Sequence, residues 1–347
     1  MSTGLLRESV ELGERSYDVH VGDGALDHAA ELLADVLPQA RRAAVVTQAE
    51  IPLTIDPGIE HEVFTIGQGE AAKSLATIGE LCSAFAEWGL TRGDYVVGFG
   101  GGLVTDVAGF AAASYHRGVP VVQVPTTLLG QVDAAIGGKT GVNLPQGKNL
   151  VGAFWQPSAV LCDTATLATL PAREWRSGLG ELAKYAFLGA EADGRRLEDL
   201  PLPERVARCV RLKADVVSGD EREGGRRALL NYGHTLGHAL EVAGRFDLRH
   251  GEAVAIGLVF AAELARVLGR IDDERVQRHR EIVGAYDLPM SLPPDLDPDE
   301  LLELMGRDKK AVSSLTFILD GPGGVEVVPD VDPAAVREAV AAMEAHR

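Results

Sequence analysis

The chain has 347 residues, of which 46% are hydrophobic and 24% are charged, so its length suits about two globular domains. The formal net charge of −18 makes nucleic acid and anionic membranes poor general partners, and an anionic ligand would need a local basic pocket. The three cysteines, Cys82, Cys162 and Cys209, are widely spaced and odd in number. They argue against a disulfide framework and against a cysteine-rich zinc site.

Neither an apolar secretory segment nor a run of about 18 apolar residues is evident, so we expect a cytoplasmic protein without a membrane span. Lysine is rare beside arginine, which makes each retained lysine a pointer to a place where an ammonium group is needed. The lysines are Lys73, Lys139, Lys148, Lys184, Lys213, Lys309 and Lys310.

Short apolar runs alternate with helical stretches in the first half of the chain. This alternation predicts a parallel sheet covered by helices. The expected strands are Ser16–Val21, Ala43–Thr47, His61–Ile66, Tyr95–Gly98, Pro120–Val124 and Ala159–Asp163. The expected helices include Leu26–Leu37 and Ser74–Trp88.

The second half is mainly helical, because apolar residues recur there at steps of three and four. The expected helices are Ser177–Leu188, Pro203–Ser218, Leu230–Val242, Gly251–Leu268, Asp273–Tyr286, Pro298–Met305 and Pro333–His346. The stretch Leu315–Val328 predicts a β-hairpin around a Gly/Pro turn. We expect an α/β domain over residues 1–172 and a mainly helical domain over 173–347, with the cleft between them as the default site.

Three motifs in the first half follow expected strands. Gly98–Asp106 (GFGGGLVTD) has glycines that allow the backbone to approach a pyrophosphate, ahead of a helix N-terminus that favours anions. Pro125–Thr127 offers hydroxyl groups, and Gln68–Lys73 (QGEAAK) offers a Glu and a Lys for ribose or phosphate. A tight turn without a ligand and a surface ion pair remain the alternatives for the first and last of these motifs.

Two further motifs present lysines. Asp133–Asn149 (DAAIGGKTGVNLPQGKN) places two of them beside glycines, where they can contact phosphate or carboxylate unless they are simply solvated loop residues. In Gly180–Lys184 (GELAK) the Glu and the Lys share a helix face, for which an exposed ion pair is the alternative.

The segment Asn231–His250 carries the clearest signal for a metal site. His234 and His238 are spaced i,i+4 on one helix face, and His250 follows closely. From spacing alone, His234 and His238 are both expected as ligands, with His250 or Glu181 completing the set.

Basic residues flank this segment on both sides and suit a substrate with two anionic groups. Lys213 and Arg227 precede it together with Glu223, and Asp308 followed by Lys309 and Lys310 comes after it. Ordinary surface charge is the alternative for each of them alone.

Taken together, GGGLVTD, PTTLL, VDAAIGGKTGVN, GKN, SGLGELAK, LNYGHTLGHALE, HGEAVAIG and the late DKK resemble the 3-dehydroquinate synthases, a family of sugar-phosphate cyclases, over roughly residues 68 to 310. The resemblance implies a Rossmann-like NAD-binding domain and a mainly helical metal- and substrate-binding domain. It also implies conversion of 3-deoxy-D-arabino-heptulosonate 7-phosphate to 3-dehydroquinate and phosphate in the shikimate pathway of aromatic amino acid biosynthesis. The resemblance further implies that the protein uses catalytic NAD and one zinc or cobalt ion and that it forms a homodimer.

The resemblance also assigns roles to residues. It implies that Glu181, His234 and His250 hold the metal, which moves His238 to the substrate phosphate. The residues implied to contact NAD are Gln68, Gly69, Glu70, Lys73, Gly102, Leu103, Val104, Thr105, Asp106, Thr126, Thr127, Lys139, Lys148, Thr166, Leu167, Ala168 and Thr169. The residues implied to act in catalysis are Lys139, Lys184, Lys213, Arg227, Asn231 and His238. The residues implied to bind substrate are Asp133, Asn149, Glu223, Lys309, Lys310 and, from the neighbouring subunit, Arg117.

The sequence departs from the family pattern at two places, and two other enzyme classes are alternatives. QAEIP after the strand Ala43–Thr47 and Gln68 replace acidic or amide residues common in the family, which leaves the adenosine contacts open. Related cyclases act on glucose 6-phosphate or sedoheptulose 7-phosphate, which lack a carboxylate, whereas Lys213, Arg227 and the DKK motif favour a carboxylated substrate. A metal-dependent polyol or glycerol-phosphate dehydrogenase shares the general fold but would accumulate NADH.

Overall fold

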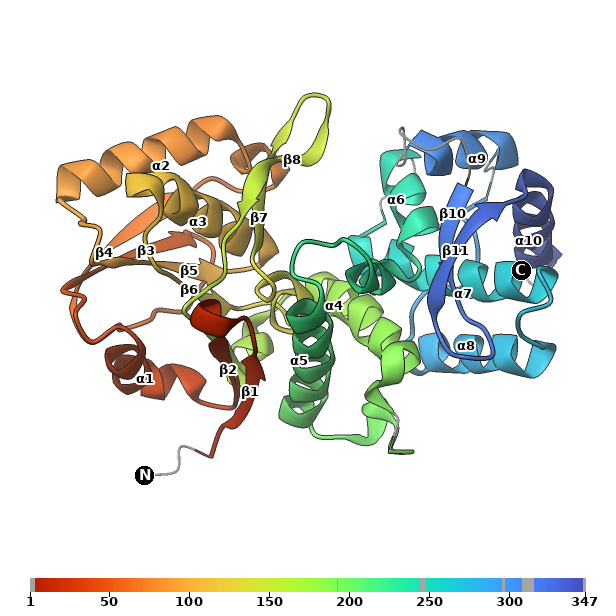
Figure 1. The fold of residues 1–347 in the computed structure, drawn as a ribbon, viewed down its shortest axis with the longest axis horizontal. Helices are drawn as coiled ribbons and strands as arrows, with labels where there is room; N and C mark the ends of the chain where they lie inside the picture. The colour runs from red at the N-terminus through yellow and green to blue at the C-terminus, as the bar shows by residue number, and fades with distance from the viewer. Residues whose placement is uncertain (1–3, 192, 244–247, 295–296, 308–314, 346–347) are drawn as a thin grey trace. The chain divides into compact units, whose positions relative to one another are not determined.

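The protein is described by a computed structural model that covers residues 4–191, 193–243, 248–294, 297–307 and 315–345. The chain forms two compact units. Unit 1 comprises Met1–Pro171 and Pro201–Arg222, and unit 2 comprises Ala172–Leu200 and Glu223–Arg347. Figure 1 labels the helices and strands of both units, which are described separately below. No helix among the described residues is both long and apolar enough to cross a membrane.

Unit 1 is built on a seven-stranded sheet with the order β1-β2-β9-β6-β5-β3-β4. Every neighbouring pair is parallel except β1 with β2, which is antiparallel. The strands are β1 (Leu6–Val10), β2 (Tyr17–Gly22), β3 (Arg42–Gln48), β4 (Glu60–Ile66), β5 (Tyr95–Gly100), β6 (Val121–Pro125) and β9 (Ala159–Asp163). The six expected strands are therefore present. The seventh, β1, was missed because its sequence LRESV is mostly polar and exposed.

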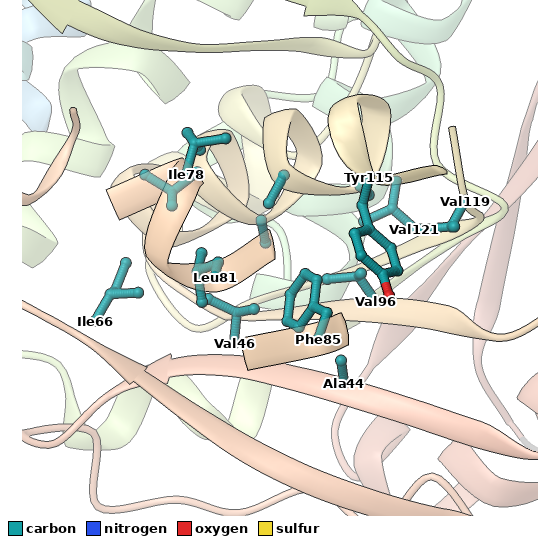
Figure 2. Packing of buried hydrophobic residues seen from close by; sticks show 14 of the residues in the cluster. Ala44, Val46, Ile66, Ile78, Leu81, Phe85, Val96, Tyr115, Val119 and Val121 are labelled. Atoms are coloured by element: carbon teal, nitrogen blue, oxygen red, sulfur yellow. The ribbon is translucent and has the colours of Figure 1, made fainter. Parts of the chain in front are cut away.

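Helices cover both faces of this sheet, because alternate residues of each strand point to opposite sides. On one face, α2 (Leu75–Trp88) and α3 (Gly102–Ser114) pack on Ala44, Val46 and Val96, as Figure 2 shows. Phe85 and Tyr115 meet there edge to face, with ring centroids 5.6 Å apart. On the other face, α1 (Ala29–Val36) packs on the alternate residues of the same strands.

Two further elements complete unit 1. The strands β7 (Lys139–Leu144) and β8 (Gly147–Phe154) form an antiparallel hairpin that was not among the expected strands, because its glycines obscure the strand pattern. The helix α5 (Leu202–Gly219) packs on β1 and on the π-helical turn Gly130–Ala134. The expected domain division placed this helix in the second half. Its apolar stripe packs on unit 1 instead.

Unit 2 is organised around α7 (His250–Val267), which is buried on nearly all sides. Apolar residues all around a helix are typical of a core position. The other helices and strands are α4 (Ala172–Tyr185), α6 (His234–Ala243), α8 (Asp273–Ala285), α9 (Pro298–Arg307), α10 (Pro333–Ala345) and the hairpin β10 (Leu315–Leu319) with β11 (Glu326–Val331). The helices α4, α6, α8 and α10 and the strand β10 all contact α7.

Candidate active site

Two glycines allow α4 and α7 to cross at very short range. A Cβ atom on Gly180 would lie 2.0 Å from the carbonyl oxygen of Gly251, and a Cβ on Gly251 would lie 1.8 Å from that of Ser177. The Ser177 hydroxyl also accepts a hydrogen bond of 3.2 Å from the Gly251 amide. This crossing places Glu181, which follows Gly180, beside His250, the first residue of α7.

A second pair of glycines brings the start of α6 against α7. Gly233 adopts φ +80°, a conformation that favours glycine, and a Cβ on Gly257 would lie 1.9 Å from the Gly233 carbonyl oxygen. His234 follows immediately as the first residue of α6. The two close approaches together deliver three polar side chains from three helices to one point.

Glu181, His234 and His250 form a compact donor set. Glu181 Oε1 lies 3.1 Å from His234 Nε2 and 2.9 Å from His250 Nε2, and the ligand atoms all lie within 4.8 Å of one another. Glu181 is fully buried and His234 is 8% exposed. Two imidazoles and one carboxylate are the donors of many catalytic zinc sites.

The hydrogen bonds of the outer ring nitrogens explain what this set needs. His234 Nδ1 lies 3.1 Å from the carbonyl oxygen of Tyr232, which only accepts, so Nδ1 carries a proton. His250 Nδ1 lies 3.1 Å from Glu241 Oε2. This carboxylate oxygen also accepts, so Nδ1 of His250 carries a proton as well. In the neutral rings with this tautomer, both Nε2 atoms would face the Glu181 carboxylate with a lone pair, unless a second proton on His250 Nε2 donates to it. Three acceptors that converge in this manner require a positive charge between them, so the residues present fit a divalent cation.

The acid–base properties of the set agree with this requirement. Burial alone would raise the pKa of Glu181, but the Lys184 ammonium, with which it is ion-paired, and His234 hold that pKa well below its usual range. Burial would lower the pKa of His250, yet its hydrogen bonds to Glu181 and Glu241 raise it to about 10. The surroundings therefore favour an ionised carboxylate and a positive charge next to it.

His238 lies close to the donor set of Glu181, His234 and His250 but is not one of its three members. Its ring centroid is 5.3 Å from that of His234 and 6.2 Å from that of His250, and the side chain is half-buried. The structure brings together the set that the resemblance implied, rather than both histidines of the i,i+4 pair. Helical spacing alone did not register that Gly180 brings a third helix to this point.

In unit 1, the residues expected at NAD follow the carboxyl ends of parallel strands. Parallel sheets bind ligands at this edge, near the point where the strand order reverses, which here lies between β3 and β5. The motifs follow four different strands. They are Gln68–Lys73 after β4, Gly102–Asp106 after β5, Thr126 and Thr127 after β6, and Thr166–Thr169 after β9.

Polar contacts link two of these motifs to each other and to the β7–β8 hairpin. Lys73 is 7% exposed and its ammonium pairs with the Asp106 carboxylate, while Glu70 Oε2 accepts a 2.6 Å hydrogen bond from Asn143 Nδ2. Burial raises the pKa of Asp106, and the ion pair with Lys73 acts against that rise. The segment after β4 is thereby fixed to the start of α3 and to the β7–β8 hairpin.

The residues expected at the substrate form pairs within each unit. In unit 1, Lys213 Nζ donates to Asp133 Oδ1 over 2.7 Å. In unit 2, Asn231 Nδ2 donates to Glu223 Oε1 over 3.1 Å, and Arg227 is 1% exposed nearby on a 3₁₀ turn. Lys139 and Lys148 lie on the β7–β8 hairpin and are exposed. Lys309 and Lys310 lie outside the described residues.

Backbone strain coincides with three of the expected substrate residues. Arg117, Asn149 and Glu223 have φ of 66°, 57° and 61°, in a region that side chains with a Cβ rarely adopt. Such strain concentrates at functional sites, where the surrounding structure holds it in place. Sequence reasoning had singled out the segment that ends at Asn149 and the stretch that contains Glu223, whereas Arg117 came only from the family resemblance. It missed the glycine crossings and Glu241, whose signal is the Glu at the end of GHALE, one turn beyond His238.

Comparison with known proteins assigns both halves of the chain to one family. Residues 63–177 match the family model for the 3-dehydroquinate synthase N-terminal domain, and residues 178–311 match the C-terminal model. A putative aminodehydroquinate synthase of Amycolatopsis mediterranei is 55% identical, with 94% of this chain and 91% of that protein covered. A 3-dehydroquinate synthase of Symbiobacterium thermophilum is 45% identical, with 94% and 98% covered.

Two solved structures share the whole fold. A 2-deoxy-scyllo-inosose synthase complexed with carbaglucose-6-phosphate, NAD+ and Co2+ has a TM-score of 0.84 at 26% identity, covering 96% of this chain and 99% of that one. The 2-epi-5-epi-valiolone synthase of Streptomyces hygroscopicus with bound NAD+ and Zn2+ has a TM-score of 0.80 at 30% identity, covering 97% and 99%. The expected combination of an α/β domain and a mainly helical domain is confirmed.

Proposed function

Because this chain belongs to the 3-dehydroquinate synthase family of carbon–oxygen lyases, we propose that it converts 3-deoxy-D-arabino-heptulosonate 7-phosphate to 3-dehydroquinate and phosphate. The observation that carries the proposal is the convergence of Glu181, His234 and His250 on one point. The activity would place the protein in the cytoplasm, in the shikimate pathway of aromatic amino acid biosynthesis. The family motifs support this substrate against the carboxylate-free sugar phosphates.

Two cofactors follow from the same proposal. The donor set would hold zinc or cobalt, and the strand ends of unit 1 would hold NAD, as in the related cyclases. When bound, the metal would polarise the hydroxyl oxygen on the carbon that is oxidised, and NAD would accept the hydride from that carbon. The helix N-terminus at Gly102 would favour the pyrophosphate, with Lys139 and Lys148 as further cations.

The remaining polar residues would bind different groups of the substrate. Asn231, His238 and Lys139 would hold the phosphate, where charge assistance strengthens each hydrogen bond. Lys213 and Arg227 would hold the carboxylate, together with the Lys309 and Lys310 pair. Lys184 would stabilise negative charge that develops on an oxygen of the substrate. In a homodimer, Arg117 would complete the site of the neighbouring subunit.

Phosphate release tests this proposal directly. Purified protein with substrate, NAD and zinc is expected to release phosphate and the cyclised product without net NADH. Stoichiometric NADH would indicate a dehydrogenase, and absence of phosphate would contradict the synthase. His250→Ala is expected to lose bound zinc and activity, whereas His61→Ala, on the exposed strand β4, keeps both.

A second candidate follows from the 55% identity to the putative aminodehydroquinate synthase, which exceeds the 45% identity to the synthase of Symbiobacterium thermophilum. That name indicates a product with an amino group, so the amino-substituted analogue of the same phosphate is an alternative substrate. The ratio of the two kcat/KM values decides between them. A ratio above about 100 in either direction corresponds to nearly 3 kcal/mol of difference at the transition state.

A further inference from the structure

Glu241 contacts the imidazole of His250 at the nitrogen that does not face Glu181. Glu241 Oε2 lies 3.1 Å from His250 Nδ1, whereas Glu181 Oε1 lies 2.9 Å from His250 Nε2. The Glu241 side chain is only 17% exposed. Each ring nitrogen of His250 thus has a carboxylate of its own, one from α4 and one from α6.

His234 is supported differently. Its Nδ1 lies 3.1 Å from the backbone carbonyl of Tyr232, a neutral acceptor in the segment that leads into α6. No side-chain substitution removes that carbonyl. His250 is supported by the charged side chain of Glu241, which a substitution can change. Glu241 lies seven residues after His234 on the same helix.

We propose that Glu241 is a positioning residue, which orients His250 and makes its Nε2 a stronger ligand for a divalent cation held with Glu181 and His234. The inference rests on the proposed metal site. An ionised carboxylate only accepts, so it keeps the proton on Nδ1 and leaves the Nε2 lone pair for the cation. Its negative charge also increases electron donation by the ring, as carboxylates behind metal-binding histidines do generally.

The nearby donor atoms allow one other arrangement. His238, Glu241 and His250 also have ligand atoms within 4.8 Å of one another, so Glu241 can be imagined as a ligand of a second ion. A neutral imidazole has one lone pair, however, and His250 could serve both sets only by losing both ring protons. With one cation per chain, Glu241 therefore acts through His250.

Three variants separate orientation, charge and simple loosening of the helix. Glu241→Gln keeps an acceptor oxygen for Nδ1 but removes the charge, and Glu241→Ala removes both. Glu252→Gln is the matched control, because Glu252 also supports the start of α7, where its carboxylate accepts a 3.0 Å hydrogen bond from the Arg249 amide without contacting His250.

The measurements are the dissociation constant of zinc, by competition with a chelator, and the visible spectrum of the cobalt-loaded protein. We expect Glu241→Ala to weaken zinc binding about 10- to 100-fold and to shift the cobalt bands, with Glu241→Gln intermediate. Glu252→Gln is expected to stay within about 2-fold of the unmodified protein with an unchanged cobalt spectrum.

Several outcomes would overturn the inference. Unchanged affinity and spectrum in both Glu241 variants, or equal losses in Glu252→Gln, would remove the specific role of Glu241. Two zinc ions in the unmodified protein and one in Glu241→Gln would make Glu241 a ligand instead. Failure of the proposed metal site itself is distinguishable, because His250→Ala would then bind zinc as tightly as the unmodified protein.

Discussion

In unit 1 the candidate cofactor residues lie at the ends of parallel strands, whereas in unit 2 the candidate metal donors lie where helices cross. The strand ends are defined by backbone register, so residues after β4, β5, β6 and β9 share one edge whatever their side chains. The donors of unit 2 converge only because Gly180, Gly251 and Gly257 allow helices closer together than a Cβ permits. Substitutions should therefore affect the two sites through different physical causes.

The largest effect is expected at the crossing of α4 and α7. Gly251→Ala would place a Cβ 1.8 Å from the Ser177 carbonyl oxygen, so backbone has to move. We expect a loss of about 3 kcal/mol or more in the free energy of unfolding and a much weaker zinc site. Urea unfolding and zinc titration measure the two effects.

Gly284→Ala is the control for that variant. Gly284 lies exposed in α8 of the same unit, where a Cβ would meet only Met290 at 3.7 Å, an ordinary contact distance. Stability and zinc affinity should stay the same or rise slightly. A Gly251→Ala protein as stable as this control would show that the crossing tolerates a wider spacing.

A buried histidine of unit 2 should make stability depend on pH. His279 is fully buried, stacks on Phe187 and accepts a 2.8 Å hydrogen bond from the Tyr232 hydroxyl while its Nδ1 donates to the Arg275 carbonyl. Burial lowers its pKa to about 4. Below pH 6.5 this histidine is protonated in the unfolded chain, whereas in the folded chain it stays neutral down to about pH 4. The free energy of unfolding therefore falls between pH 6.5 and pH 4, by up to about 3 kcal/mol, and then levels off.

His279→Gln tests this dependence because glutamine does not titrate. The variant is expected to be less stable at neutral pH but to lose less on going from pH 6.5 to pH 4. Both proteins are compared without metal, since metal binding has a pH dependence of its own. Parallel stability curves for the two proteins would contradict the assignment of this window to His279.

The contrast between the units also explains how far sequence could lead. Six of the seven strands in the large sheet of unit 1 were predicted, because buried apolar runs such as Tyr95–Gly100 carry their own signal. The i,i+4 pair His234 and His238 was correctly placed on one helix, but the other two members of the donor set, Glu181 and His250, come from α4 and α7. Which residues meet across a helix crossing depends on tertiary distances, so the sequence alone left His250 and Glu181 as alternatives, and the family motifs placed Glu181 with His234 across 53 residues of sequence.

A smaller effect is expected at the strand ends of unit 1. Lys73→Met would leave the Asp106 carboxylate, whose side chain is 20% exposed, without its cation. We expect a loss of roughly 2 kcal/mol, less than for a fully buried pair, and weaker NAD binding. Arg7→Met is the control, because its pair with Asp18 is exposed and should contribute little. Equal losses in the two variants would mean that burial of Lys73 has no energetic consequence.

The smallest effect on stability is expected at a glycine that permits no close contact between elements. Gly79 lies exposed in the middle of α2, where a Cβ would meet nothing within 4 Å. Gly79→Ala should therefore raise the free energy of unfolding by about 0.5 to 1 kcal/mol, because alanine loses less backbone entropy in a helix. Thermal unfolding of this variant beside Gly251→Ala compares a glycine of unit 1 that only adds flexibility with one of unit 2 that permits contact. A loss of stability in Gly79→Ala would show that α2 approaches another surface there. Close packing at glycine would then not distinguish unit 2 from unit 1.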